Sequence, residues 1–264
     1  MPEYQVSLMR YDVVPEKEAD FQKWYEEIHI PDHLFGARPE WRRFRLCEIV
    51  PTAQGPEPLR PYADPTGHPK FLILLERENA PLGGGGGGEG QMSEGQRDFT
   101  ANWLQHLRGY TTAAYKFFLE VEASDYGKTI APGKRDYHLS LMRFDVVPEK
   151  EDAFNEWYDK VHIPELFTRQ QTPWRAVRRA TFSPPRNITG WQAQYALTTG
   201  QPKYLILLER EIVAETPPPG APIPHGVHDF VTNWLPHLRN YTSIAYRCKV
   251  HATKEEFART RQGH

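Results

Sequence analysis

The chain has little cysteine, no long apolar run and no excess of charge of either sign. Its 264 residues include two cysteines, Cys47 and Cys248, at non-equivalent places in the repeat described below, so we expect no disulfide framework and a reducing compartment. No apolar stretch approaches the roughly 20 residues that span a bilayer, and no basic region followed by an apolar run is visible at the N-terminus. A formal net charge of −2 lacks the basic excess of a nucleic-acid-binding protein. These absences predict a cytoplasmic protein without nucleic-acid or membrane partners.

One unit is present twice. The pattern F-x-x-W-Y-x-x-x-H-I-P occupies residues 21–31 and returns at residues 154–164, which is 133 positions later. Both copies follow the same leader, Ser-Leu-Met-Arg-aromatic-Asp-Val-Val-Pro-Glu-Lys-Glu. Because two domains of ordinary size fit this chain length, we predict two units, residues 1–124 and 134–264, joined by a short linker that contains Gly and Pro.

The motif itself is typical of an amphipathic helix. Phe21, Trp24, Tyr25 and Ile28 fall at i, i+3, i+4 and i+7, which places them on one buried face. Pro31 is expected to end the helix, because the residue before a proline is disfavoured in the helical region.

Each unit shows six elements in the same order. In the first unit, strand patterns occupy residues 4–12, 41–50, 70–77 and 110–121, and helical patterns occupy residues 15–31 and 93–107. This order, strand-helix-strand-strand-helix-strand, is that of the split βαβ unit, with two helices on one face of a four-stranded sheet. The other face of each sheet is also apolar, so the two sheets should pack against each other. The predicted fold class is α+β, with tandem ferredoxin-like (βαββαβ) repeats forming an intramolecular pseudo-dimeric α+β barrel.

The motif helix, placed just after the first strand of such a unit, resembles the EthD-like branch of the dimeric α+β barrel (ferredoxin-like) superfamily. The resemblance covers nearly the whole chain as two fused copies. It implies a ligand in each unit between the sheet and its helices. Relatives of this kind include lactone isomerases, polyketide cyclases, dehydratases, decarboxylases, haem-dependent enzymes, oxygenases without cofactor and proteins without known activity, so the resemblance does not identify a reaction.

Histidines 29 and 162, at the end of each motif helix, are the leading catalytic candidates. On a helical wheel each lies at the border of the buried face, where an imidazole could reach a cleft while partly solvated, and titration near neutrality suits proton transfer. The equally weighted alternative is that each imidazole caps the last carbonyls of its helix. Tyr25 and Tyr158, one turn earlier, could orient a carbonyl or phenolate oxygen, although packing at the edge of the core explains them as well.

Candidate substrate-binding residues lie near the ends of the first strands. Arg10 and Asp12, like Arg143 and Asp145, alternate onto one face of a strand. Such a pair is most often a structural ion pair, and the functional version is an arginine that binds an anionic substrate while the aspartate holds it in place.

Two further pairs are candidates for lining the ligand site. Tyr62 and Tyr195 lie in long loops that keep their pattern in both copies, which is typical of a lid. His106 and His237 end the second helices, either as solvated residues or as part of the same cleft. No metal-ligand spacing such as H-x-H or H-E-x-x-H is present, so we expect neither a metal nor another cofactor.

These residues favour a metal-free enzyme of lyase or isomerase type that dehydrates, decarboxylates or cyclises a small cyclic or aromatic substrate. One alternative is a non-catalytic small-molecule-binding or assembly protein. Another is a haem- or oxygen-dependent oxidoreductase of the same superfamily. Further homo-oligomerisation stays open.

Overall fold

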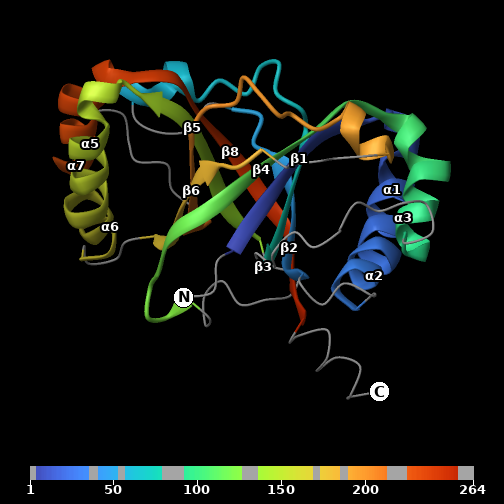
Figure 1. The fold of residues 1–264 in the computed structure, drawn as a ribbon. Helices are drawn as coiled ribbons and strands as arrows, with labels where there is room; N and C mark the ends of the chain where they lie inside the picture. The colour runs from blue at the N-terminus through green and yellow to red at the C-terminus, as the bar shows by residue number, and fades with distance from the viewer. Residues whose placement is uncertain are drawn as a thin grey trace.

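The computed structural model describes residues 4–35, 41–52, 57–78, 92–126, 136–168, 173–184, 190–212 and 225–254. Their eight strands close into a barrel, with helices on two opposite sides (Figure 1). The strands are β1 (Tyr4–Val13), β2 (Trp41–Ile49), β3 (Phe71–Glu78), β4 (Leu107–Glu122), β5 (Tyr137–Val146), β6 (Trp174–Phe182), β7 (Tyr204–Glu211) and β8 (Leu238–Thr253).

The helices of the first repeat are α1 (Glu18–Trp24), α2 (Ile30–Phe35) and α3 (Glu94–Asp98), and those of the second are α5 (Glu151–Trp157), α6 (Ile163–Thr168) and α7 (His225–Asp229). Wider π-helical turns follow α1, α3, α5 and α7 at Tyr25–His29, Phe99–Trp103, Tyr158–His162 and Phe230–Trp234. None of the described helices is long and apolar enough to cross a membrane.

The strand order around the barrel is β1-β3-β2-β8-β5-β7-β6-β4, and every described pair is antiparallel. Each repeat supplies four neighbouring strands in the order 4-1-3-2. Two seams, β2–β8 and β4–β6, join the repeats by backbone hydrogen bonds. The predicted fold class, a pseudo-dimeric α+β barrel within one chain, is confirmed.

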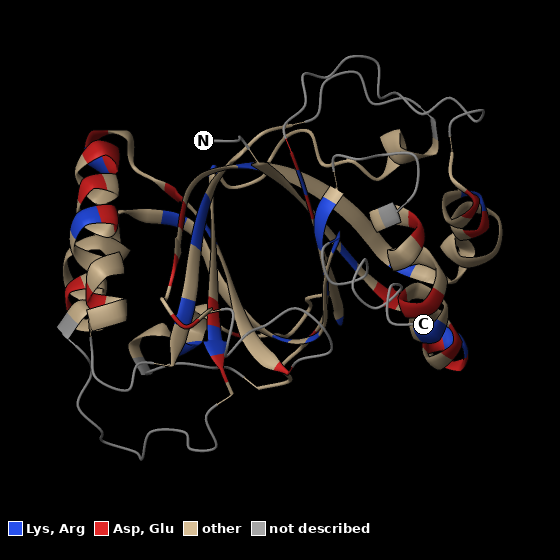
Figure 2. Ribbon diagram, turned by 90° about the horizontal axis from the view of Figure 1, so that it is seen from below, with Lys and Arg blue, Asp and Glu red and all other residues tan. Residues whose placement is uncertain are grey.

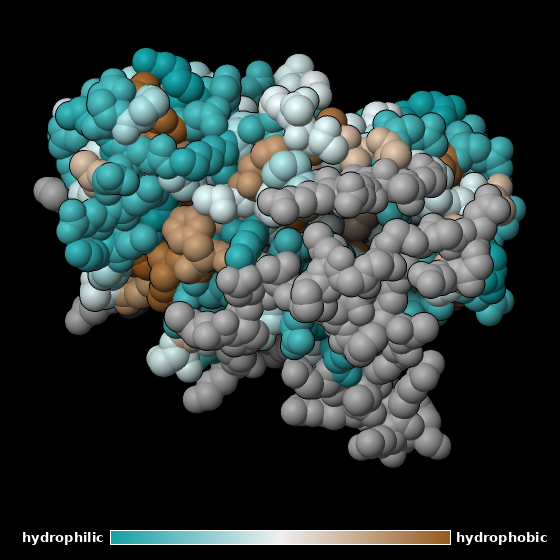
Figure 3. Space-filling view, viewed as in Figure 1, coloured by the Kyte–Doolittle hydropathy of each residue, from teal (hydrophilic) through white to brown (hydrophobic). Residues whose placement is uncertain are grey.

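Three apolar cores follow from the alternation of side chains along the strands. On β1, Val6 and Leu8 point into the lumen, where residues of both repeats form one cluster. Tyr11 and Val13 point outward into a second cluster beneath α1 to α3, and the second repeat has its own equivalent. The sheet therefore separates the lumen from the helices. The outer surfaces of both helix layers are mostly hydrophilic on the side drawn in Figure 3.

The motif helix does not end at Pro31, as the sequence suggested. The π-helical turn Tyr25–His29 carries the chain into α2, and the N–H of Ile30 donates to the carbonyl of Tyr25, five residues back. A wider turn accommodates Pro31 directly after Ile30, because proline has no N–H to donate to a helical carbonyl. The turn also rotates the helix face, so Ile28 is 50% exposed although it was expected to be buried.

Ionic groups fill one part of the lumen. Arg45, Arg178, Glu76 and Glu209 have fully buried side chains. Arg45 bridges Glu76 and Glu209, and Arg178 also binds Glu209, so the network ties β2 and β3 of one repeat to β6 and β7 of the other. Although burial alone would raise the pKa of Glu209, the charges of Arg178 and Arg45 hold it well below its ordinary value. Figure 2 shows positions of Lys, Arg, Asp and Glu on the barrel strands as well as on the helices.

Candidate functional site

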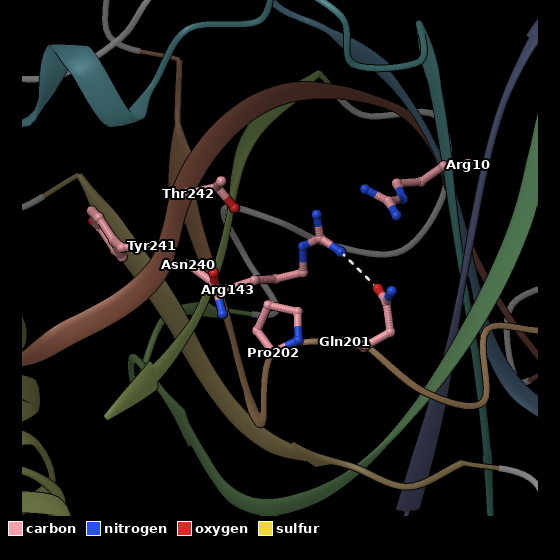
Figure 4. A pocket seen from close by; sticks show the side chains of 8 residues that line it. Arg10, Arg143, Gln201, Pro202, Asn240, Tyr241 and Thr242 are labelled. Carbon is pink, nitrogen blue, oxygen red and sulfur yellow. Dashed lines mark hydrogen bonds between the residues drawn. The ribbon is translucent and has the colours of Figure 1, made fainter. Parts of the chain in front are cut away.

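Arg10 of β1 and Arg143 of β5 reach one cavity of the barrel, which is open to solvent. The cavity has a volume of about 420 Å³, and the two guanidinium groups point toward each other across it (Figure 4). Its lining consists of Arg10, Arg143, Gly200, Gln201, Pro202, Asn240, Tyr241 and Thr242. The arginines are equivalent in the two repeats, and each continues the lumen-facing row of its strand. Closing the barrel therefore joins two predicted binding residues in one site.

The arginines are close enough to affect each other. Burial, and then the charge of Arg143, lower the pKa of Arg10 to about 10. Arg143 donates from Nη1 to the Gln201 side-chain oxygen at 3.1 Å. Both guanidinium groups remain charged at neutral pH. The cavity therefore presents two cations to whatever enters it.

Two buried tyrosines at equivalent positions, Tyr115 and Tyr246, accompany the arginines, and neither was predicted from the sequence. The Tyr115 hydroxyl donates to the Pro202 carbonyl at 3.2 Å. The Tyr246 hydroxyl has no hydrogen-bond partner within the described part of the chain. Burial raises the pKa of Tyr246 to about 12, against the opposing charges of Arg10 and Arg143. Because a buried hydroxyl is normally hydrogen-bonded, Tyr246 is suited to bind a ligand oxygen. Alternation with the lumen residues of β8 was the signal that could have found it.

His68 is a third residue that was not predicted. It is half-buried, and burial together with the charges of Arg10 and Arg143 lowers its pKa. Its equivalent in the second repeat is Gln201, the partner of Arg143. At this position the first repeat therefore has a titratable group and the second a neutral amide.

The predicted aspartates have a different role from the expected ion pairs. Asp12 accepts a hydrogen bond from the backbone N–H of Lys70, and Asp145 accepts one from Lys203, both at 2.7 Å. Asp145 also accepts from the Asn240 side chain at 2.8 Å. In the described ranges, neither aspartate forms an ion pair with the arginine two positions earlier. The aspartates fix the loop that precedes β3 or β7, because that loop crosses the end of the first strand.

The helix histidines lie on the other side of the sheet. His29 is 6% exposed rather than partly solvated, and it lies within a continuous helix rather than at its end. Its Nδ1–H donates to the Gly95 carbonyl of α3 at 3.3 Å. Its ring centroid lies 4.7 Å from that of Tyr25. Burial, and then the nearby His33, lower the pKa of His29 well below its ordinary value, so the imidazole is neutral at pH 7.

The second repeat encloses its histidine beside a tyrosine in the same way. His162 is 7% exposed, and its ring centroid lies 4.8 Å from that of Tyr158. Each predicted His–Tyr pair is therefore assembled, but neither pair faces the arginine cavity. The catalytic role of these four residues stays a prediction.

The loop tyrosines cross between repeats. Tyr62 packs against Tyr241 of the second repeat, with centroids 5.2 Å apart, and Tyr195 packs against Tyr110 of the first at 5.1 Å. Each loop thus covers the apolar core between the sheet and the helices of the other repeat, and not the predicted ligand site of its own repeat. Because Tyr241 also borders the cavity, the loop of Tyr62 lies beside the arginine site.

The histidines of the second helices do not join this site. The carbonyls of His106 and His237 accept hydrogen bonds from Val14 and Val147 at 3.0 Å, which attaches the end of each second helix to the end of a first strand. Within the described residues, no group of three or more His, Cys, Asp or Glu side chains could hold a metal ion. The expected lack of a metal stays a prediction.

No protein-family profile matches the chain, and no curated protein matches it either. Solved structures do resemble it. A proposed monooxygenase from Fusobacterium nucleatum has a TM-score of 0.61 at 11% identity, covering 96% of this chain and 95% of the other. A proposed monooxygenase from Lactobacillus acidophilus gives 0.56 at 9% identity, covering 96% and 97%. An anthrone oxidase-like protein gives 0.53 at 11%, covering 96% and 94%. At such identities the comparison shows shared architecture, and this chain has the dimeric α+β barrel fold of these proteins.

Proposed function

We propose that this protein is an enzyme that binds a small anionic or enolisable organic molecule in the lumen cavity, between Arg10 and Arg143. The observation that carries the proposal is the convergence of these two arginines on one cavity. Guanidinium groups bind carboxylates and other oxyanions through charge-assisted hydrogen bonds. The volume of about 420 Å³ falls in the range of small-molecule sites. We also retain the EthD-like branch as the proposed position of the chain within its superfamily.

The proposed chemistry is proton transfer beside a carbonyl group. His68, whose pKa is lowered by burial and by the two arginines, is neutral at pH 7 and is able to accept a proton from carbon. The arginines and the Tyr246 hydroxyl would stabilise the negative charge that develops on the carbonyl oxygen. Return of the proton to another carbon, or loss of a leaving group, gives the isomerase or lyase outcome expected from the sequence.

A second candidate is oxidation by molecular oxygen. The similar structures include proposed monooxygenases and an anthrone oxidase-like protein, and an enolate held by arginines is an electron-rich species that oxygen can oxidise. An oxygen electrode separates the two reactions, because only the oxidation consumes oxygen in proportion to substrate. The helix histidines do not fit an axial haem ligand, since the ring of His29 is enclosed by Trp24, His33 and Phe99 at centroid distances of 4.8, 4.2 and 5.5 Å.

The test combines ligand binding with turnover. Cyclic and aromatic carboxylates and enolisable ketones are screened by thermal shift, and hits are titrated against Arg10→Gln and Arg143→Gln. We expect each variant to weaken binding by at least about tenfold, as loss of a charged hydrogen bond costs about 1.5–3 kcal/mol. His68→Gln should keep binding and lose turnover.

The matched control is Arg247→Gln, which removes an exposed arginine of β8 paired with Asp136, and it should bind like wild type. Equal binding by the wild type and both cavity variants would contradict the proposal. Binding without turnover of any hit would favour the alternative of a binding protein. Loss of turnover in His29→Ala and His162→Ala, with His68→Gln fully active, would show that the helix histidines, and not His68, carry the proton transfer.

A further inference from the structure

Cys47 and Cys248 are neighbours, although 201 positions separate them in the chain. Cys47 lies on β2 and Cys248 on β8, and the strand register pairs them directly across the seam between the repeats. Their sulfur atoms are 2.9 Å apart, and both residues are fully buried. Both are free thiols in the structure.

A shift in strand register produces this contact. Leu46 pairs with Val250, but Cys47 pairs with Cys248, so Lys249 is an extra residue on β8. The bulge leaves Lys249 unpaired and places Cys248, rather than Lys249, opposite Cys47. Both cysteines therefore face the lumen, within the apolar cluster that the two repeats share. Because the equivalent positions of the other repeat hold Ala180 and Phe117, the duplication gave no hint of a pair.

We propose that Cys47 and Cys248 form an intramolecular disulfide when the protein meets a small hydroperoxide, which joins the two repeats covalently across the β2–β8 seam. Residues directly opposite each other in antiparallel strands have Cα atoms about 4.5–5.5 Å apart, inside the range of about 4.4–6.8 Å that a disulfide requires. The sulfurs, already 2.9 Å apart, have to approach by only about 0.9 Å to reach the S–S bond length of about 2.05 Å. This inference does not depend on the proposed function.

The chemistry balances with one equivalent of hydrogen peroxide. One thiol attacks the peroxide, its sulfur is oxidised to a sulfenic acid, and the O–O bond breaks with release of water. The second thiol then attacks that sulfur, the S–S bond forms, and a second water leaves with the remaining oxygen and both protons. Burial raises the pKa of the Cys47 thiol, which lowers its thiolate fraction and slows the first step. Because both cysteines are fully buried, the oxidant must be small enough to enter the barrel, and larger disulfides are excluded from the site.

The experiment uses the full chain. The reduced, folded protein is treated with hydrogen peroxide, the peroxide is removed, and the protein is unfolded in excess iodoacetamide before its intact mass is measured. We expect no alkylation and a mass lower by about 2 Da, for the two hydrogens lost. A proteolytic digest should contain one disulfide-linked pair of peptides carrying residues 47 and 248, and dithiothreitol should restore two alkylated thiols.

Cys47→Ser and Cys248→Ser provide the controls, and each should retain one alkylated thiol and give no linked peptide. Oxidised wild type should also unfold at a higher temperature than the reduced protein, since the crosslink closes a long loop of the unfolded chain. Two alkylated thiols after treatment of the wild type, or gain of oxygen atoms on either cysteine without a linked peptide, would overturn the proposal. Because both outcomes are read from the wild type, the test stands even if a serine variant fails to fold.

Discussion

Arg10 and Arg143 illustrate how duplication gives a residue a partner that one repeat alone could not supply. In each repeat the arginine continues the lumen face of the first strand, and closure of the barrel brings the two guanidinium groups to one cavity. Within the described residues, neither has a carboxylate within ion-pair distance. Gln201 and Tyr246 offer neutral polar atoms, which do not cancel the charges. A ligand that carries negative charge would relieve the repulsion between the arginines.

Buried histidines should make stability depend on pH. Burial lowers the pKa of His29 and of His251 well below the ordinary value, with His33 and Arg43 as the nearest further causes. In the unfolded chain both histidines titrate near 6.5. Below that pH the unfolded state binds more protons than the folded state, so stability is complete above about pH 6.5 and falls as the pH drops. Each histidine should contribute a loss of up to about 1.4 kcal/mol per pH unit between pH 6 and 5.

Urea unfolding at pH 7.5, 6.5 and 5.5 measures this dependence. His251→Gln should show a smaller loss between pH 6.5 and 5.5 than wild type, whatever its stability at pH 7.5. His228→Gln on α7 is the matched control, since His228 is exposed, and it should reproduce the wild-type loss. The assignment would be refuted by identical losses in wild type and His251→Gln.

At the scale of elements, the close approach of α3 to α2 in the first repeat depends on Gly95. A Cβ placed on Gly95 of α3 would lie 2.7 Å from Oδ2 of Asp32 and 3.1 Å from its Cβ, whereas on Gly226 the nearest atom is Oε2 of Glu165 at 2.6 Å. The longer glutamate side chain can swing away, but the aspartate cannot move without shifting α2 and losing its bond with Ser93. We expect Gly95→Ala to destabilise the protein by about 1–3 kcal/mol.

Gly226→Ala is the internal control for this contact. Alanine favours a helix over glycine by about 1 kcal/mol, and that gain should offset the cost of moving Glu165, so the variant should unfold close to wild type. Urea unfolding of both variants gives the comparison. A smaller cost for Gly95→Ala than for Gly226→Ala would show that the helices are not in tight contact at Gly95.

The order of elements could be predicted because each has a local periodicity, and the barrel followed from sheets with two apolar faces. The continuation of the helix past Pro31 could not be predicted, since it depends on a π-helical turn whose hydrogen bonds leave no trace in the hydrophobic pattern. The pairing of Cys47 with Cys248 and the crossing of the Tyr62 loop to Tyr241 also escaped prediction. Both contacts are between the repeats, and the sequence of one repeat does not show which strands of the other repeat it will contact.

Only some of the predicted site residues meet in the structure, and the face of the sheet on which each residue lies explains which ones. Arg10 and Arg143 were placed by strand alternation and are equivalent in the repeats, so their convergence required only barrel closure. The helix histidines were assigned to a ligand cleft because a helical wheel placed them at the border of the buried face, where an imidazole could reach such a cleft. The sheet lies between them, however, because Arg10 and Tyr11 point to opposite faces of β1 and only Tyr11 faces the motif helix.

For the whole molecule, barrel closure predicts that neither half is complete alone. Opening the seams would expose the backbone groups of β2, β4, β6 and β8, the lumen cluster, and the ion pairs of Arg45 and Arg178 with Glu209. An unpaired buried charge is strongly destabilising, and free strand edges associate. Residues 1–124 and 134–264, expressed separately, should therefore aggregate or form dimers, and mixing them during refolding should give a one-to-one complex. Sedimentation equilibrium measures the masses, and urea unfolding the stability. Two monomeric halves that each unfold cooperatively at the midpoint of the full chain would show that the seams contribute nothing to stability.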